Sequence, residues 1–201
     1  MPPLTLQTER HLVIVLGAAC WVIGTALWAF GAPVYRVVAW WIAFLVLTIA
    51  GERLELSRFL PPSVTARRAF AGIVVLLLGS LAAWPLAGAP HAFGMALLAL
   101  AAWLLKQDIA RRTVKQQGLT RFIAVCLLSG YFWLAVGGGV IAFAGLAPGN
   151  PAYDAALHAL LLGFVFSMVF GHAPIIFPAV LRVAVPYHPV FYGPLVLLHL
   201  S

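Results

Sequence analysis

Residues 154–182 read DAALHALLLGFVFSMVFGHAPIIFPAVLR. This stretch is apolar almost throughout, and it is long enough to cross a lipid bilayer as a helix. It carries His158 and His172 in a setting where an imidazole is costly and needs a partner. The stretch therefore predicts a membrane-spanning helix, and its two histidines are the first candidates for chemistry.

The composition of the whole chain agrees with a membrane protein. Of the 201 residues, 64% are hydrophobic and only 8% are charged, whereas a soluble domain carries roughly 25% charged residues. Water does not solvate a chain with so few charges, so the composition excludes a soluble globular fold. Because lipid offers the backbone no hydrogen-bond partner and no alternating β-barrel pattern is present, the spans should be helices.

Apolar runs separated by charged residues, glycine and proline predict six complete spans and part of a seventh. The six complete runs cover residues 11–30, 34–50, 69–86, 91–105, 122–146 and 154–182. A further apolar run, residues 190–201, is too short to cross, so we expect the chain to be cut short within that span. The predicted fold is an all-α polytopic helical bundle that forms a single integral-membrane domain over residues 1–201.

The basic residues indicate how the bundle is oriented. Eleven of the twelve Lys and Arg residues fall at the N-terminus or in the loops on its side of the membrane, and only Arg36 falls on the other side. Basic residues concentrate in cytoplasmic loops, so the N-terminus is predicted to be cytoplasmic, in a bacterial-type inner membrane. The net charge of +7 then reflects loops that flank lipid. The lipid bilayer is the expected partner, and no nucleic acid is expected.

Six histidines supply the candidate metal ligands, because a neutral imidazole is a common ligand of metals and of haem iron. His158 and His91 lie near the outer ends of their spans and are expected at one level. His172 lies 14 residues after His158, about 21 Å along a helix. At 100° per residue the two face within about 40° of each other, so both are expected to point into the bundle.

Two metal sites are predicted from these depths. One joins His158 to His91, or to a histidine beyond the sequence given, near the outer surface. The other joins His172 to His199, deeper in the membrane. The alternative is that a histidine hydrogen-bonds to a carbonyl or to lipid headgroups, which we favour for His11, His91 and His188 at span ends.

Charged residues near span ends are the other candidates. Glu52, Arg53 and Glu55 gather where the second span ends, either as a solvated cluster or as a proton entry point or ion pair between helices. Asp154 is expected to cap the sixth helix beside His158. Pro174 and Pro178 are expected to bend that helix after His172, for packing or to shape a cavity.

The pattern His158-Ala159-Leu160-x-x-Gly163, followed by Met168 and Gly171, resembles a stretch of the NnrS family. Members are multi-span bacterial membrane proteins described as binding haem and copper and linked to nitric-oxide stress. The family is often compared with the histidine-rich helices of haem-copper oxidase subunit I. The resemblance implies that His158 is a metal or haem ligand.

The sequence therefore leads to a primary functional hypothesis and two alternatives. The first is a membrane protein that binds haem b, copper or both, and handles nitric oxide, oxygen or electrons. The second is a transporter in which intramembrane histidines line a proton or solute path. The third is a non-catalytic subunit or assembly factor, in a homo-oligomer or with other membrane subunits. No nucleotide-binding loop and no Ser-His-Asp set is present, so no class of soluble-type enzyme is assigned.

Overall fold

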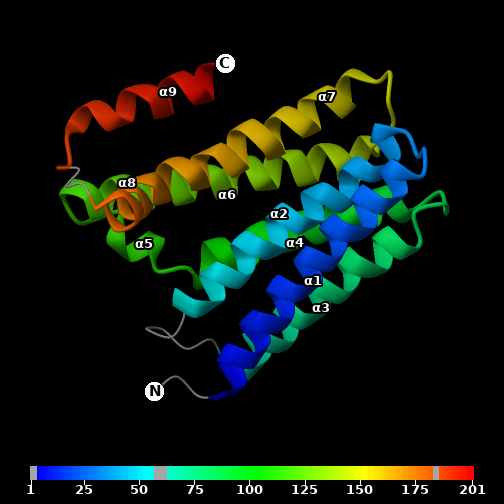
Figure 1. Cartoon of the computed structure of the whole chain (residues 1–201), viewed down its shortest axis with the longest axis horizontal. Coiled ribbons are helices and arrows are strands. Elements are labelled where there is room, and N and C mark those ends of the chain that lie inside the picture. The colour runs from blue at the N-terminus through cyan, green and yellow to red at the C-terminus, as the bar shows by residue number, and fades with distance from the viewer. Residues whose placement is uncertain (1–3, 57–62, 183–185) are drawn as a thin grey trace.

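The computed structural model describes residues 4–56, 63–182 and 186–201. Within these ranges every regular element is helical and no strand is present (Figure 1). The elements are α1 (Leu4–Ala29), α2 (Val34–Leu56), α3 (Val64–Ala82), α4 (Ala89–Gln107), α5 (Ala110–Thr113), α6 (Gly118–Ala144), α7 (Pro151–Leu157), η2 (His158–Phe166), α8 (Ser167–Leu181), η3 (Pro189–Phe191) and α9 (Tyr192–Leu200). The predicted all-α helical bundle is confirmed.

Six helical segments are long and apolar enough to cross a membrane, as predicted. All six differ from their predicted bounds at one end or both, and the third and fourth show why. The third begins at Val64 because the Ser63 hydroxyl accepts a hydrogen bond from the backbone N–H of Ala66 at 3.2 Å, which caps the helix before its apolar run. The fourth has 19 residues, since α4 starts with Pro90 in its first turn and continues to Gln107.

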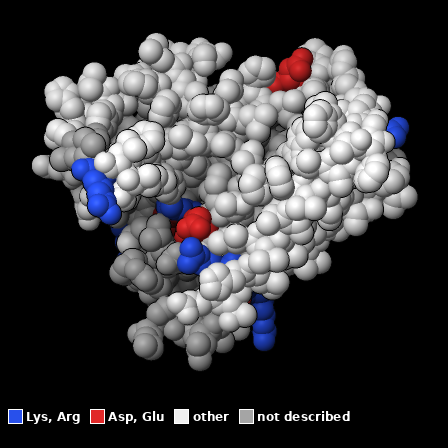
Figure 2. Space-filling model, in the orientation of Figure 1, with Lys and Arg blue, Asp and Glu red and all other residues white. Residues whose placement is uncertain are grey.

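The spans run alternately up and down, as contacts between helix ends show. At one end the Arg10 guanidinium pairs with Glu52 at 3.3 Å, which joins the start of α1 to the end of α2. At the other end His91 Nδ1 donates to the carbonyl of Ala142 at 2.9 Å, which joins the start of α4 to the end of α6. Blue side chains gather near the N-terminus and α5 in Figure 2. Arg36 lies in the first turn of α2, at the opposite end of that helix from Glu52 and its partner Arg10. We call the end that holds Arg10 and Glu52 the basic end.

α6 lies in the centre of the bundle and packs against α4 on one side and against α7, η2 and α8 on the other. Glycines bring these backbones close together. A Cβ added to Gly94 would lie 2.3 Å from the backbone nitrogen of Ala142, and one added to Gly138 would lie 2.9 Å from the Leu97 side chain. A Cβ on the neighbouring Gly137 would meet Leu160, on the other side of α6. These glycines form close helix contacts.

The sixth span runs without a break through α7, η2 and α8 (Figure 1), and its middle part, η2, is a π-helix of nine residues. A π-helix bonds i to i+5, so each residue turns through a smaller angle than in an α-helix. The calculation that put His158 and His172 on one face assumed an α-helix and is wrong. His158 is exposed, whereas His172 is partly buried and lines a cavity.

The two prolines lie inside α8 without ending it, because the helix continues to Leu181 and ends at Arg182 with a positive φ of 54°. Beyond it α9 folds back beside the sixth span (Figure 1). A hydrogen bond joins α9 to α6: the indole N–H of Trp133 donates to Nδ1 of His199 at 2.9 Å. Cys20 and Cys126 are buried free thiols, as expected for small core residues.

Candidate functional site

Among the residues that the structure describes, Arg53 is the one buried cation. It lies one turn before the end of α2 at the basic end, and only 7% of its surface is exposed. The same face of α2 buries Val46, Ala50 and Leu54, so the periodicity that packs the helix also draws Arg53 inward. A buried guanidinium is costly unless it is paired, so the groups around it define the candidate site.

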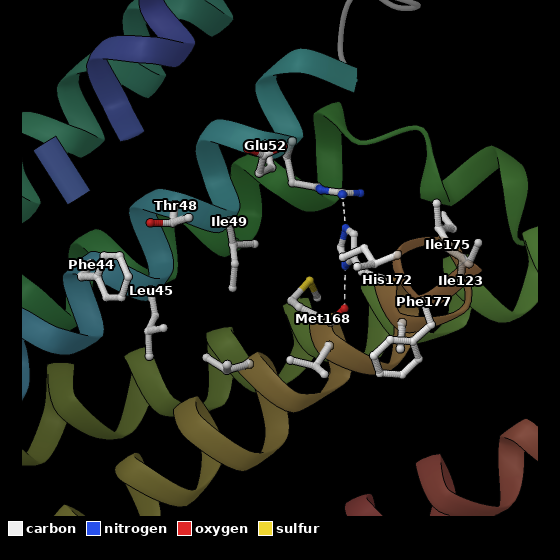
Figure 3. A pocket seen from close by; sticks show the side chains of 15 residues that line it. Phe44, Leu45, Thr48, Ile49, Glu52, Ile123, Met168, His172, Ile175 and Phe177 are labelled. Atoms are coloured by element: carbon white, nitrogen blue, oxygen red, sulfur yellow. Dashed lines mark hydrogen bonds between the residues drawn. The ribbon is translucent and has the colours of Figure 1, made fainter. Parts of the chain in front are cut away.

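His172 of α8 provides the side-chain partner of Arg53. Its Nδ1 donates to the carbonyl of Met168, one turn earlier, at 2.5 Å. That bond places the ring proton on Nδ1, and Nε2 then accepts a hydrogen bond from the Arg53 guanidinium. Figure 3 shows both bonds in line through the imidazole ring. His172 is therefore neutral here, and neither of its ring nitrogens is free.

The nearby carboxylates are engaged elsewhere. Glu52 pairs with Arg10, and Asp108 accepts from the hydroxyl of the fully buried Tyr131 at 2.5 Å and from the Ala110 N–H at 2.8 Å. Within residues 4–54, 63–182 and 186–201, no carboxylate forms an ion pair with Arg53. The side chain of Glu55, a predicted member of this cluster, lies outside the described part of the chain.

Arg53 and His172 lie at the wall of a cavity of about 660 Å³ between α2 and the sixth span. The wall is almost entirely apolar. It consists of Phe44, Leu45, Thr48, Ile49, Glu52, Arg53, Ile123, Val165, Met168, Val169, His172, Ala173, Ile175, Ile176 and Phe177. The hydroxyl of Thr48 points away toward α1 in Figure 3 and lies at Gly17. Apart from Thr48, the polar residues of the wall are Arg53 and His172, with Glu52 at the exposed rim.

Part of the cavity wall is exposed at the surface of the bundle. Val169 and Ile176, on the wall provided by α8, are each 50% exposed, and Phe177 is 56% exposed. In a membrane these side chains would contact acyl chains. The opening between α2 and α8 therefore faces lipid, and the buried guanidinium lies behind it.

The other predicted ligands have separate partners and do not line this cavity. His158 Nδ1 lies 2.7 Å from the carbonyl of Asp154, His91 lies at Ala142, and His199 stacks on Trp133 with their ring centroids 6.2 Å apart. Among the residues that the structure describes, no group of three or more His, Cys, Asp or Glu side chains is placed to hold a metal ion.

Asp154 does not cap the sixth helix. The side chain of Asn150 does so, accepting from the Ala152 N–H at 3.0 Å, and Asp154 lies in the first turn.

Sequence reasoning also missed the buried bond between Tyr131 and Asp108. Its only signal was an acidic residue directly after a span, which also fits a solvated loop.

The fold defines a multi-pass helical membrane protein with one polar site behind an apolar cavity. The chain belongs to the family described as domain of unknown function DUF8744, whose family model matches residues 4–201. No curated protein and no solved structure matches it.

Proposed function

We propose that this protein is a proton-translocating transporter in which His172 carries the proton and Arg53 controls access to it. The observation that carries the proposal is the bond between the two side chains inside the cavity, which blocks His172 Nε2 with a cation. A protonated imidazole cannot accept that bond, and it would repel the guanidinium. His172 therefore takes up a proton only when Arg53 turns away.

An anion in the cavity would draw Arg53 away. The guanidinium then bonds to the anion, and the exposed Nε2 of His172 accepts a proton while Nδ1 keeps its bond to Met168. The proton and the anion together add no net charge, which lowers the cost of moving both through a low-dielectric interior. Unbinding of the anion returns Arg53 to His172 and expels the proton.

We also propose that the basic end faces the cytoplasm of a bacterial-type inner membrane, because its loops hold the excess of Lys and Arg. In that orientation Arg53 and His172 lie in the cytoplasmic half of the bundle, and the opening between α2 and α8 meets the cytoplasmic leaflet.

Proton flux into vesicles tests the proposal. The full chain is reconstituted into neutral lipid with added phosphatidylglycerol and a long-chain carboxylate, in potassium phosphate and chloride, so that inorganic, lipid and single-chain anions are all present, and the protein-free vesicles have the same composition. An imposed pH gradient should collapse faster than in protein-free vesicles, as followed by an enclosed pH dye. His172→Gln, which keeps an acceptor for Arg53 but binds no proton, should remove about nine-tenths of this flux, as expected for loss of the essential proton carrier.

The matched control is His91→Gln, which changes an exposed histidine outside the cavity and should keep the wild-type flux. Two results would overturn the proposal. One is a wild-type flux equal to that of protein-free vesicles. The other is a His172→Gln flux equal to that of the wild type.

A haem or copper site is the second candidate, and the geometry of His158 favours it. Its bond to the carbonyl of Asp154 fixes the proton on Nδ1 and leaves Nε2 as the nitrogen available to a metal, on an exposed surface. His172 does not fit as a ligand, because both of its nitrogens are engaged. A second ligand would therefore come from a partner or from residues beyond those described.

The optical spectrum and metal content of the purified full chain test this second candidate. A Soret band that is present in the wild type and lost in His158→Ala supports ligation by His158. His188→Ala, at another exposed histidine, should leave the band unchanged. A colourless and metal-free protein, even after incubation with haem or copper, would exclude this function.

A further inference from the structure

The anion that the cavity takes can be identified by chemical class. We propose that it is a single-chain anionic amphiphile, such as a long-chain carboxylate, whose headgroup binds Arg53 and whose chain lies along the apolar wall. This inference rests on the proposed function, because both concern the same cavity. It goes further by naming what draws Arg53 away from His172.

The guanidinium supplies the evidence for an anionic headgroup. Arg53 is buried, and its Nε–H has no hydrogen-bond partner in the described part of the chain. Its one side-chain bond is to a neutral imidazole, and no described carboxylate forms an ion pair with it. A guanidinium has a planar set of five donors that matches the two oxygens of a carboxylate. An incoming carboxylate would accept from the orphaned Nε–H and give the guanidinium an ion-pair partner.

The remainder of the wall supplies the evidence for an apolar body. From Arg53 the cavity continues past Ile49 to Phe44 on α2 and past Met168 to Val165 on the sixth span. Figure 3 shows these labelled side chains of α2 as a row that leads away from the Arg53–His172 bond. A small inorganic anion would leave this apolar surface uncovered, whereas a hydrocarbon chain would cover it.

Size and access favour one chain over two. The cavity, at about 660 Å³, lies in the middle of the range of roughly 300–1,000 Å³ found for sites that enclose a small organic ligand. A phospholipid with two acyl chains is about twice as large as a single-chain amphiphile, so most of it would remain outside. The opening at Val169, Ile176 and Phe177 lets a membrane-dissolved molecule enter without crossing water.

Photolabelling in lipid nanodiscs tests the inference. The full chain is placed in neutral phosphatidylcholine with a diazirine analogue of oleate, and labelled peptides are mapped by mass spectrometry. Labels should fall on the segments that line the cavity, at residues 44–53 and 165–177. Oleate should compete for them, whereas oleyl alcohol, which has the same chain and no charge, should not.

Variants at the guanidinium make the test specific. Arg53→Met should reduce labelling by about tenfold, the size expected when a charge-assisted hydrogen bond to a ligand is lost. Arg53→Lys keeps the charge but not the planar donor set, so it should label more strongly than Arg53→Met and less strongly than the wild type, which separates binding from folding. Arg67→Met is the control, because Arg67 is also a cation near the basic end but does not line the cavity and is paired with Glu9 of α1.

Three results would overturn the inference: equal labelling in Arg53→Met and the wild type, equal competition by oleyl alcohol and oleate, or competition by phosphatidylglycerol and not by oleate. Specific labelling without proton flux would leave this inference standing and remove the transport proposal. Proton flux without specific labelling would do the reverse.

Discussion

Gly94→Ala should reduce the free energy of unfolding by about 3 kcal/mol or more, the upper end of the cost of overpacking a buried contact. A Cβ at this position would lie 2.3 Å from the backbone nitrogen of Ala142 and 2.7 Å from the carbonyl oxygen of Gly138. Both atoms are backbone, so no side chain can rotate to relieve the clash. α4 and α6 would have to separate along their whole contact, and this contact holds the two halves of the bundle together.

Gly72→Ala is the matched control. Gly72 also lies inside a spanning helix, α3, but a Cβ there would have nothing within 4 Å. Its stability should stay within about 1 kcal/mol of the wild type, because alanine is the better helix former and meets no clash. Unfolding in mixed micelles with increasing dodecyl sulfate, followed by tryptophan fluorescence, measures both variants. Equal stability of the two would show that α4 and α6 are not in close contact at Gly94.

His172→Leu should cost about 3 kcal/mol, because it leaves the buried guanidinium of Arg53 without a side-chain partner. Leucine is similar in volume to histidine and apolar, so packing alone predicts little loss in an apolar wall. The loss of unfolding free energy therefore measures the cost of leaving the charge of Arg53 without its partner. His91→Leu, at an exposed histidine with one bond to a carbonyl, should cost at most about 1 kcal/mol.

A double-mutant cycle isolates this interaction. Adding Arg53→Met to His172→Leu removes the stranded charge, so the double variant should regain stability to within about 1 kcal/mol of the wild type. The coupling between the two positions should then be about 2–3 kcal/mol. The same unfolding measurement applies to all four proteins. Additive effects of the two substitutions would show that Arg53 and His172 do not interact in the folded protein.

The sequence was sufficient to predict the class of fold. Hydropathy and the distribution of basic residues predicted six alternating spans, and contacts between helix ends such as Arg10–Glu52 agree with that alternation. These predictions succeed because lipid imposes the same requirement on every span: an apolar surface and internally bonded backbone. The side of the membrane that the basic end faces remains a prediction.

The site was predictable only in part. The sequence identified His172 and Arg53 separately, the second as a possible member of an ion pair between helices. It paired His172 with His199, but in the structure His199 lies on α9 and bonds to Trp133 of α6. The π-helix sets which residues of the sixth span share a face. The sequence has no periodic pattern that shows where nine residues form a π-helix in place of an α-helix. Distances between helices depend on glycine contacts whose partners lie about 50 residues away, as with Gly94 and Ala142.

The unequal packing of the bundle has a mechanical consequence. α1 and α2 make extensive contact with each other, whereas α2 makes few contacts with the sixth span and with α3. α4 and α6, in contrast, are locked by glycines whose contacts tolerate no added atom. Because α2 forms one wall of the cavity, a small tilt of α1 and α2 against the rest of the bundle would widen or narrow the mouth of the cavity while the glycine contacts between α4 and α6 stay intact.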